Sequence, residues 1–204
     1  MLQKDPDANL TDHQRKMIDE AEKSCDRLVA LIEEMSVISK LDAGLIVLAR
    51  QPLDLFPLVS EVAGLVQEGK NRDVHLEVRG NATGARINGD AARLRTAFDT
   101  IFRAILREKP GSTTVVADRR VDSREGRTAA VVVVADAASV QGVCDQTPVV
   151  FDDKRGGLGL ALPLALRVIE GHGGRIWSPA PADNSGDDAA RARGTAIISL
   201  PVTE

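Results

Sequence analysis

Apolar residues recur at three- and four-residue steps along the first forty positions, on an otherwise polar background. Thr11, followed three residues later by Gln14, fits a capping box at the start of a helix, and Gly44 stands where such a helix would end. The stripe is close to a heptad seam and consists of Met17, Ala21, Cys25, Leu28, Ile32, Met35 and Ile38. Because one apolar stripe cannot stabilise an isolated helix, we expect the helix over 11–41 to pack against a partner helix.

After Gly44 the pattern changes to short apolar runs separated by turn residues. Strands are expected at 45–48, 74–78, 86–88, 113–117, 128–134, 175–178 and 195–200, and helices at 55–66, 91–105 and 158–169. Pro52 is expected to end the first of these strands, and Asp90 to cap the second helix. The order predicts an α+β fold, with a mixed sheet and helices on one face. We divide the chain into a helix at 1–44 and an α/β sandwich at 45–204.

A glycine-rich stretch opens the last predicted helix. Gly156, Gly157 and Gly159 precede its apolar run, and His172-Gly173-Gly174 follows it. Glycine is typical of positions where the backbone needs a positive φ or approaches a ligand closely. Since the first turn of a helix leaves backbone N–H groups unpaired, such a loop can bind an anion. Glycine-flanked helices without a ligand are also common, so the stretch alone leaves both interpretations open.

Composition narrows the class of protein. A net charge of −4, one Trp, four Phe and no Tyr argue against a nucleic-acid partner, which needs basic surface and stacking side chains. The chain shows no apolar run of the roughly 18 residues that a bilayer requires, and its first ten residues are polar. Cys25 and Cys144 have no metal-binding spacing. We therefore expect a cytoplasmic protein with reduced thiols and no membrane segment.

Three segments of the second part resemble the ATP-binding domain of sensor histidine kinases, a Bergerat-type fold shared with gyrase. They are Gly157-Leu158-Gly159-Leu160-Ala161, His172-Gly173-Gly174, and the run from Gly194-Thr195 to Leu200-Pro201. In that family the first opens a helix, the second ends it, and the third closes the sheet. The resemblance covers nearly the whole chain and implies the Bergerat fold with ATP as cofactor.

The first helix resembles the second helix of the family's dimerisation and phosphotransfer hairpin. The matching residues are Arg27-Leu28, Leu31-Ile32 and the string from Ser39 to Gly44, with Asp42 in place of the family's Glu. The resemblance implies a homodimer through residues 11–41, and a response regulator or another two-component protein as partner. The family's phosphorylated His lies on the first hairpin helix, which has no match within these 204 residues. His13 fits the capping box instead.

The resemblance also implies a set of nucleotide contacts. They are Asp136, Gly157, Gly159, Leu160, Thr195 and Arg107. An Asp at the place of Asp136 accepts a hydrogen bond from the adenine amino group, which suits a carboxylate because it only accepts. Thr195 stands where a threonine shares a water with that Asp. Arg107 stands at the place of a lysine and could meet a phosphate. No catalytic or metal-binding residue is assigned.

Other positions depart from the family pattern. Ala138 and Val140 replace two glycines after Asp136, and each adds a Cβ where adenine or backbone approaches. Thr100 and Ala104 replace two asparagines, of which the second binds magnesium in the family. Ala104 offers no oxygen to a magnesium ion. We therefore expect weak ATP binding and doubt magnesium binding.

Two functional hypotheses stay open. The first is a degenerate kinase-like signalling protein that dimerises and docks a response regulator, with weak or no ATP turnover. The second is the ATP-binding catalytic fragment of an active sensor histidine kinase whose phospho-acceptor His lies upstream. Ala104 counts against the second hypothesis, and the intact segment 157–161 counts for it. A third hypothesis, an adaptor phosphotransferase, needs a phospho-acceptor His that the sequence does not offer.

Overall fold

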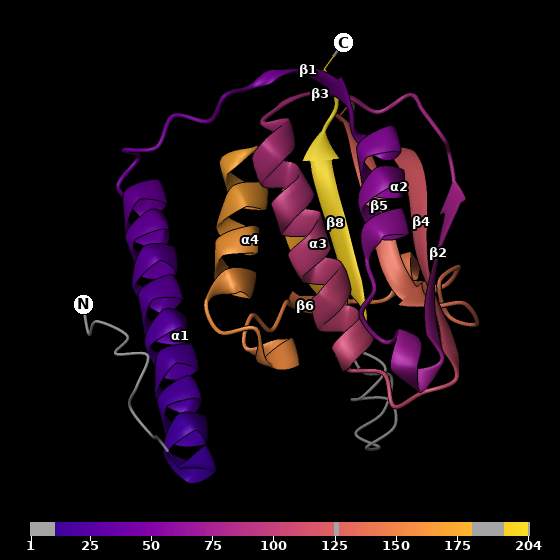
Figure 1. Ribbon diagram of the computed structural model, residues 1–204. Coiled ribbons are helices and arrows are strands. Elements are labelled where there is room, and N and C mark those ends of the chain that lie inside the picture. Colours follow the sequence, from indigo (N-terminus) through magenta and orange to yellow (C-terminus); the bar gives the residue numbers. More distant parts are fainter. Residues whose placement is uncertain (1–10, 125–126, 181–193, 204) are drawn as a thin grey trace.

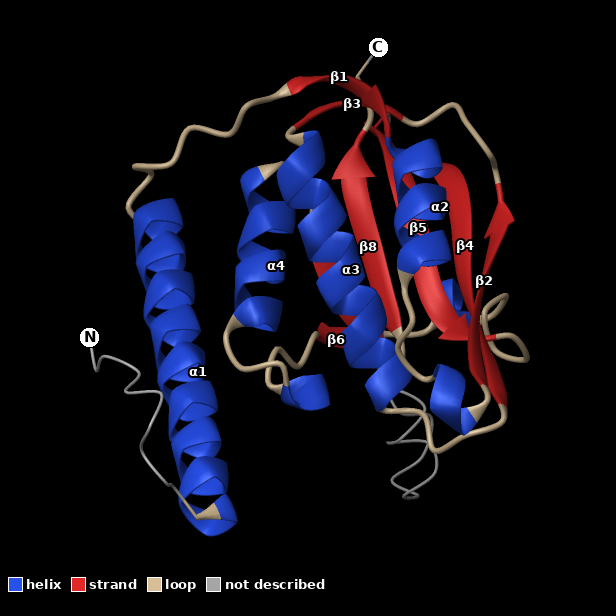
Figure 2. Cartoon of the chain, in the orientation of Figure 1, coloured by secondary structure: helices blue, strands red, loops and turns tan. Residues whose placement is uncertain are grey.

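A long helix stands beside an α/β sandwich in the computed structural model, which describes residues 11–124, 127–180 and 194–203 (Figures 1 and 2). The helices are α1 (Asp12–Asp42), α2 (Leu55–Leu65), α3 (Ala91–Arg107) and α4 (Ala161–Gly171). The strands are β1 (Gln51–Asp54), β2 (Val74–Gly80), β3 (Arg86–Gly89), β4 (Thr113–Arg124), β5 (Arg127–Asp136), β6 (Pro148–Val150), β7 (Arg175–Pro179) and β8 (Ala196–Pro201). Helices α2, α3 and α4 cover one face of the main sheet. The predicted α+β class is confirmed.

Six strands form the main sheet, in the order β2-β4-β5-β8-β7-β6. Strands β2 and β4 run parallel, and the other neighbours pair antiparallel. The predicted hairpin of β4 and β5 is confirmed, with Val115 opposite Asp136. Strands β1 and β3 form a separate two-stranded antiparallel sheet. The carboxyl end of β5 is thereby held in the middle of the fold, with Asp136 as its last residue.

The sheet has an apolar core on each face, because side chains alternate along its strands. Val132 and Val134 of β5 pack under the helices, together with Phe98 and Phe102 of α3. The intervening residues of β5 contribute to a smaller core on the opposite face. That smaller core consists of Val116, Val131, Val133, Ala135, Val140, Val143 and Ile197. The segment after β5 therefore folds over the face of the sheet that carries no helix.

One predicted strand is wrong. Residues 45–50 form no strand, and the pairing begins instead at Gln51, with Pro52 inside β1 opposite Asn88. Proline is tolerated there because β1 has a partner on one side only and needs no second ladder of hydrogen bonds. Leu45 and Val47 are exposed, so their apolar character reflects no buried strand. Strand β6, next to β7, was not predicted.

His172 and Asp90 join the start of α3 to the end of α4. The backbone N–H of Asp90 donates to Nε2 of His172 (2.9 Å), and Nδ1 of His172 donates to the carbonyl oxygen of Val168 (2.7 Å). The Asp90 carboxylate accepts from the backbone N–H groups of Arg93 and Ala49 (both 3.1 Å). Asp90 thus caps α3, as predicted, and also fixes the segment between α1 and β1.

Burial lowers the pKa of His172 below its usual 6.5, because the imidazolium would lose its hydration. Arg50 and Arg93 also lower this pKa, whereas the Val168 carbonyl and the Asp90 carboxylate act in the opposite direction. Protonation would also place a second N–H against the N–H of Asp90. The neutral ring therefore contributes stability that is complete above about pH 6.5 and is lost as the pH falls toward the lowered folded-state pKa.

We expect His172→Gln to flatten this pH dependence, because its side chain does not titrate. The free energy of unfolding, measured by urea denaturation between about pH 5 and pH 8, should fall less on acidification than in the unaltered chain. His13→Gln removes an exposed imidazole of α1 and is the matched control, which should keep the original slope. Equal slopes for the unaltered chain and His172→Gln would contradict the assignment.

Candidate nucleotide site

Three glycines shape the loop in front of α4 as the sequence predicts. Gly156, Gly157 and Gly159 have φ angles of 70°, 60° and 62°, a left-handed conformation that favours glycine. Leu160 is the N-cap residue of α4 and provides no side-chain cap. The loop therefore reaches the helix with the backbone that an anion-binding turn requires.

The loop lies directly against α3. A Cβ added at Gly156 would stand 2.8 Å from the Cα of Ala104, closer than side chains approach a backbone. Ala104 is fully buried, so the position of the family's magnesium-binding asparagine is covered by this loop. Thr100, one turn earlier, is also buried. The loop and α3 are therefore in direct contact at Ala104.

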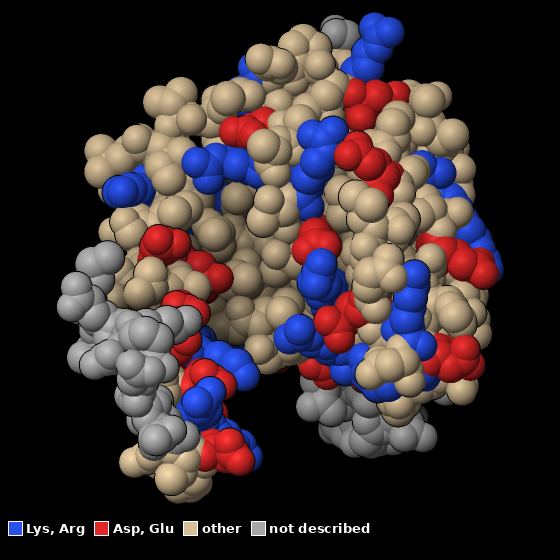
Figure 3. All heavy atoms as spheres, in the orientation of Figure 1, with Lys and Arg blue, Asp and Glu red and all other residues tan. Residues whose placement is uncertain are grey.

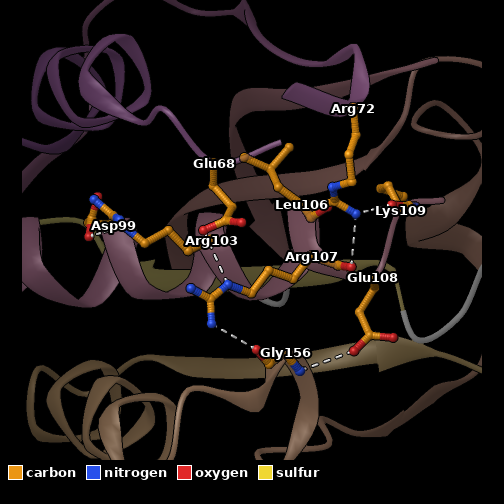
Figure 4. Close-up of polar contacts among 9 residues, drawn as sticks. All are labelled: Glu68, Arg72, Asp99, Arg103, Leu106, Arg107, Glu108, Lys109 and Gly156. Carbon is orange, nitrogen blue, oxygen red and sulfur yellow. Dashed lines mark hydrogen bonds and ion pairs between the residues drawn. The ribbon is translucent and has the colours of Figure 1, made fainter. Parts of the chain in front are cut away.

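Arg107 holds this contact from the last turn of α3 (Figure 4). Its Nη1 donates to the carbonyl oxygen of Gly156 (3.2 Å), and its Nε lies 3.1 Å from a carboxylate oxygen of Glu68. The backbone N–H of Gly156 donates to the neighbouring side chain of Glu108 (3.0 Å). The guanidinium that was predicted to meet a phosphate is therefore engaged by the chain's own carbonyl and carboxylate groups.

Asp136 forms an ion pair with a lysine. Nζ of Lys109 lies 2.8 Å from Oδ1 of Asp136, in a geometry that brings the charges together without the alignment of a hydrogen bond. The Lys109 side chain is only 5% exposed, although lysine is rarely buried unless it is paired. Lys109 is a residue that sequence reasoning missed. In sequence it looks like any surface lysine after a helix, and only the packing of α3 against β5 reveals its position.

Thr195 lies beside a second buried cation. Arg155 donates from Nη1 to the carbonyl oxygen of Thr195 (3.3 Å), from Nη2 to Oγ of Ser178 (3.1 Å), and from Nε to the carbonyl oxygen of Asp152 (2.8 Å). Its guanidinium lies 4.0 Å from the ring centre of buried Phe151. Arg155 therefore joins the segment before α4 to β7 and β8, and sequence reasoning missed it too.

The residues after Asp136 take a different course from the one expected. The backbone N–H groups of Ser139 and Val140 donate to the carbonyl oxygen of Asp136 (2.9 and 3.0 Å), which forms a tight turn. Val140 then packs into the core on the open face of the sheet. Its side chain is therefore buried, whereas exposed Ala138 lines a hollow together with Asp136.

The six predicted contact residues lie at the end of α3, in the loop before α4, at the end of β5 and just before β8, and their contacts are to other residues of this chain. Arg107 contacts the loop of Gly157, Gly159 and Leu160 by way of Gly156. Asp136 and Thr195 each contact a cation of this chain. Within the described ranges, no group of three or more His, Cys, Asp or Glu side chains gathers as a metal site would require.

Two further observations concern the surface. No helix in the described part of the chain has the length and apolar character needed to cross a bilayer. On the face shown in Figure 3, acidic and basic side chains are interspersed rather than separated by sign.

Comparison with known proteins gives one similar sequence. The signal transduction histidine-protein kinase BaeS of Escherichia coli K12 is 27% identical over 163 residues, which cover 73% of this chain. The chain spans 33% of the length of that kinase. No protein-family model matches the chain.

Solved structures share the fold at lower identity. Acinetobacter baumannii histidine kinase AdeS aligns with a TM-score of 0.60 and 13% identity over 91% of this chain and 83% of the other. Full-length ShkA in complex with AMPPNP aligns with a TM-score of 0.64 and 17% identity, over 95% of this chain and 39% of ShkA. Histidine kinase ThkA in complex with response regulator protein TrrA aligns with a TM-score of 0.57 and 16% identity, over 96% of this chain and 53% of the other. The chain is thus similar in sequence to a histidine kinase and shares the fold of solved histidine kinase structures.

Proposed function

We propose that this chain is a kinase-like protein of two-component signalling that acts by binding other proteins and turns over little or no ATP. The observation that carries the proposal is the contact between Gly156 and Ala104. Magnesium takes near-octahedral oxygen ligands and usually binds together with substrate phosphates. At this place the helix offers a methyl group, and the loop covers it.

Neither Cys25 nor Cys144 forms a disulfide in the described part of the chain, which supports a cytoplasmic location.

The alternative is the ATP-binding part of an active sensor histidine kinase whose phospho-acceptor His lies upstream. The conformation of the loop favours it, because Gly157 and Gly159 keep the positive φ angles that the glycine motif requires. The ShkA structure, which contains AMPPNP, also supports nucleotide binding as a possibility for this fold. The two candidates differ in whether magnesium strengthens nucleotide binding.

We expect ATP binding to be weak or absent and nearly independent of magnesium. A missing metal ligand typically costs about 1–3 kcal/mol, which is about 5- to 150-fold in affinity. Isothermal titration with and without magnesium measures the affinity for ATP and its dependence on magnesium. Asp136→Asn is the matched variant; circular dichroism checks that it stays folded after Lys109 loses its charged partner, and the folded variant should bind ATP as weakly as the unaltered chain does. A low-micromolar, magnesium-dependent affinity would support the active kinase instead.

Helix α1 provides a surface for a second copy of the chain. Its other side faces the domain, where Asp42 pairs with Arg167 of α4 at 2.9 Å and Leu41 packs against the core. The stripe of Met17, Leu28, Ile32 and Met35 is 58–66% exposed. We propose a homodimer through residues 11–41, because each of these side chains would contribute about 1.5–3 kcal/mol when buried.

Replacement of Leu28 and Ile32 by Asp should give monomers or aggregates, because it places charges in the proposed seam. Sedimentation velocity at tens of micromolar distinguishes these states from a dimer. Glu33→Lys changes a charge beside the stripe and is the control, for which we expect a dimer. A monomeric unaltered chain would contradict the proposed homodimer.

We propose a response regulator as the partner of the polar side of α1, with the ThkA–TrrA complex as support. This side carries both signs of charge, including Lys23 and Arg27. Complementary charges set the rate of association and the choice of partner more than the affinity.

Charge reversal at Lys23 and Arg27 should slow association with a response regulator captured from the native cell, and added salt should act in the same direction. Surface plasmon resonance measures the association rate and the dissociation rate separately. Asp136→Asn lies in the other part of the chain and is the matched control. A partner that is lost on Asp136→Asn, yet unaffected by the helix charges, would contradict docking on α1.

A further inference from the structure

The face of the sheet that carries no helix has a hollow of its own. Its volume is about 520 Å³, and it is lined by side chains of β4, β5, β7 and β8 and by Cys144 of the segment after β5. Pockets for small ligands have volumes of roughly 300–1,000 Å³. An adjoining hollow shares Cys144, Arg175 and Trp177 with it. None of the six predicted nucleotide contacts lines either hollow.

Strand register determines the floor of this hollow. Arg175 of β7 lies opposite Ser199 of β8, and Ser199 lies opposite Val131 of β5. Val131 in turn lies opposite Arg120 of β4. Residues that lie opposite one another in a sheet point to the same face. The short side chains of Ser199 and Val131 therefore form a low floor, with one arginine at each end of the row.

Arg175 is the cation of this row that lacks an acidic partner. Its side chain is exposed, and among the described residues its guanidinium forms no ion pair and no hydrogen bond. The guanidinium carbon lies 5.8 Å from the ring centre of half-buried Trp177, two residues along the same strand. A positive charge and an aromatic ring thus stand together at the β7 side of the hollow.

The acidic side chains around the hollow lie nearer to Arg120. Asp118 and Asp122 are two residues before and after it on β4, so all three side chains lie on the open face of the sheet. Asp122, which lines the hollow, has a partner of its own. Asp145 lines the adjoining hollow instead. An anion in the hollow is therefore attracted to the β7 side, where Arg175 stands.

We propose that this hollow binds a small aromatic carboxylate, with the carboxylate on Arg175 and the ring against Trp177. A guanidinium presents paired N–H donors that match the two oxygens of a carboxylate. The ring would also contact Val131 and Pro201, which line the hollow, and an aromatic pair gains more than the burial of its area. This site goes beyond the proposed signalling role and needs neither ATP nor magnesium.

Benzoate is the probe, and Trp177 is the reporter because it is the one tryptophan of the chain. A proton–nitrogen correlation spectrum therefore shows a single indole signal, whose shift during a titration gives the affinity at this hollow. Benzamide has the ring without the charge, and cyclohexanecarboxylate has the charge without the aromatic ring. We expect benzamide to bind at least about tenfold more weakly than benzoate, because it lacks the charge-assisted hydrogen bonds, and cyclohexanecarboxylate several-fold more weakly.

Arg175→Gln should lower the affinity for benzoate at least about tenfold, and Arg175→Lys, which keeps the charge, should lower it less. Arg79→Gln is the matched control, because Arg79 pairs with Glu77 on β2, outside the hollow, and we expect its affinity to be unaltered. Circular dichroism checks that each variant is folded. An indole signal that does not move with benzoate, equal binding of benzoate and benzamide, or unaltered binding by Arg175→Gln would overturn the inference.

Discussion

The close approach of the glycine-rich loop to α3 determines what this fold can do. Gly156 can lie on Ala104 because neither residue has a side chain larger than a methyl group. Arg107 and Glu108 then fix the loop through its carbonyl oxygen and its N–H group. The start of α4 is placed by the same contact, since the loop leads directly into that helix. In this structure the backbone of the loop lies directly on α3.

Two buried cations complete the closure. An unpaired charge in a protein interior is very costly, so Lys109 and Arg155 must find partners in the fold. Lys109 pairs with Asp136 at the end of β5, and Arg155 donates to oxygen atoms of the residue just before β8, of β7 and of its own segment. In the first case a cation of the chain pairs with the carboxylate that the kinase resemblance assigns to nucleotide binding.

The sequence predicted what depends on local rules. The positive φ angles at Gly157 and Gly159, the cap at Asp90 and the alternation of β5 all follow from residue type and period. What it could not predict depends on which segments meet in space. Lys109 looks like a solvated lysine until β5 is placed beside the end of α3. Residues 45–48 look like a strand because they are apolar, but nothing pairs with them. Val140 looks like an obstacle to a base, yet its turn directs it into the core on the open face of the sheet.

The central claim is that the chain's own groups occupy the nucleotide site. A crystal structure grown with millimolar AMPPNP and magnesium tests it most directly. The account predicts that Gly156 still lies against Ala104, that Nζ of Lys109 still pairs with Asp136, and that density for a metal is absent between α3 and the loop. An adenine base hydrogen-bonded to Asp136, with Lys109 displaced and magnesium bound to the phosphates, would contradict it.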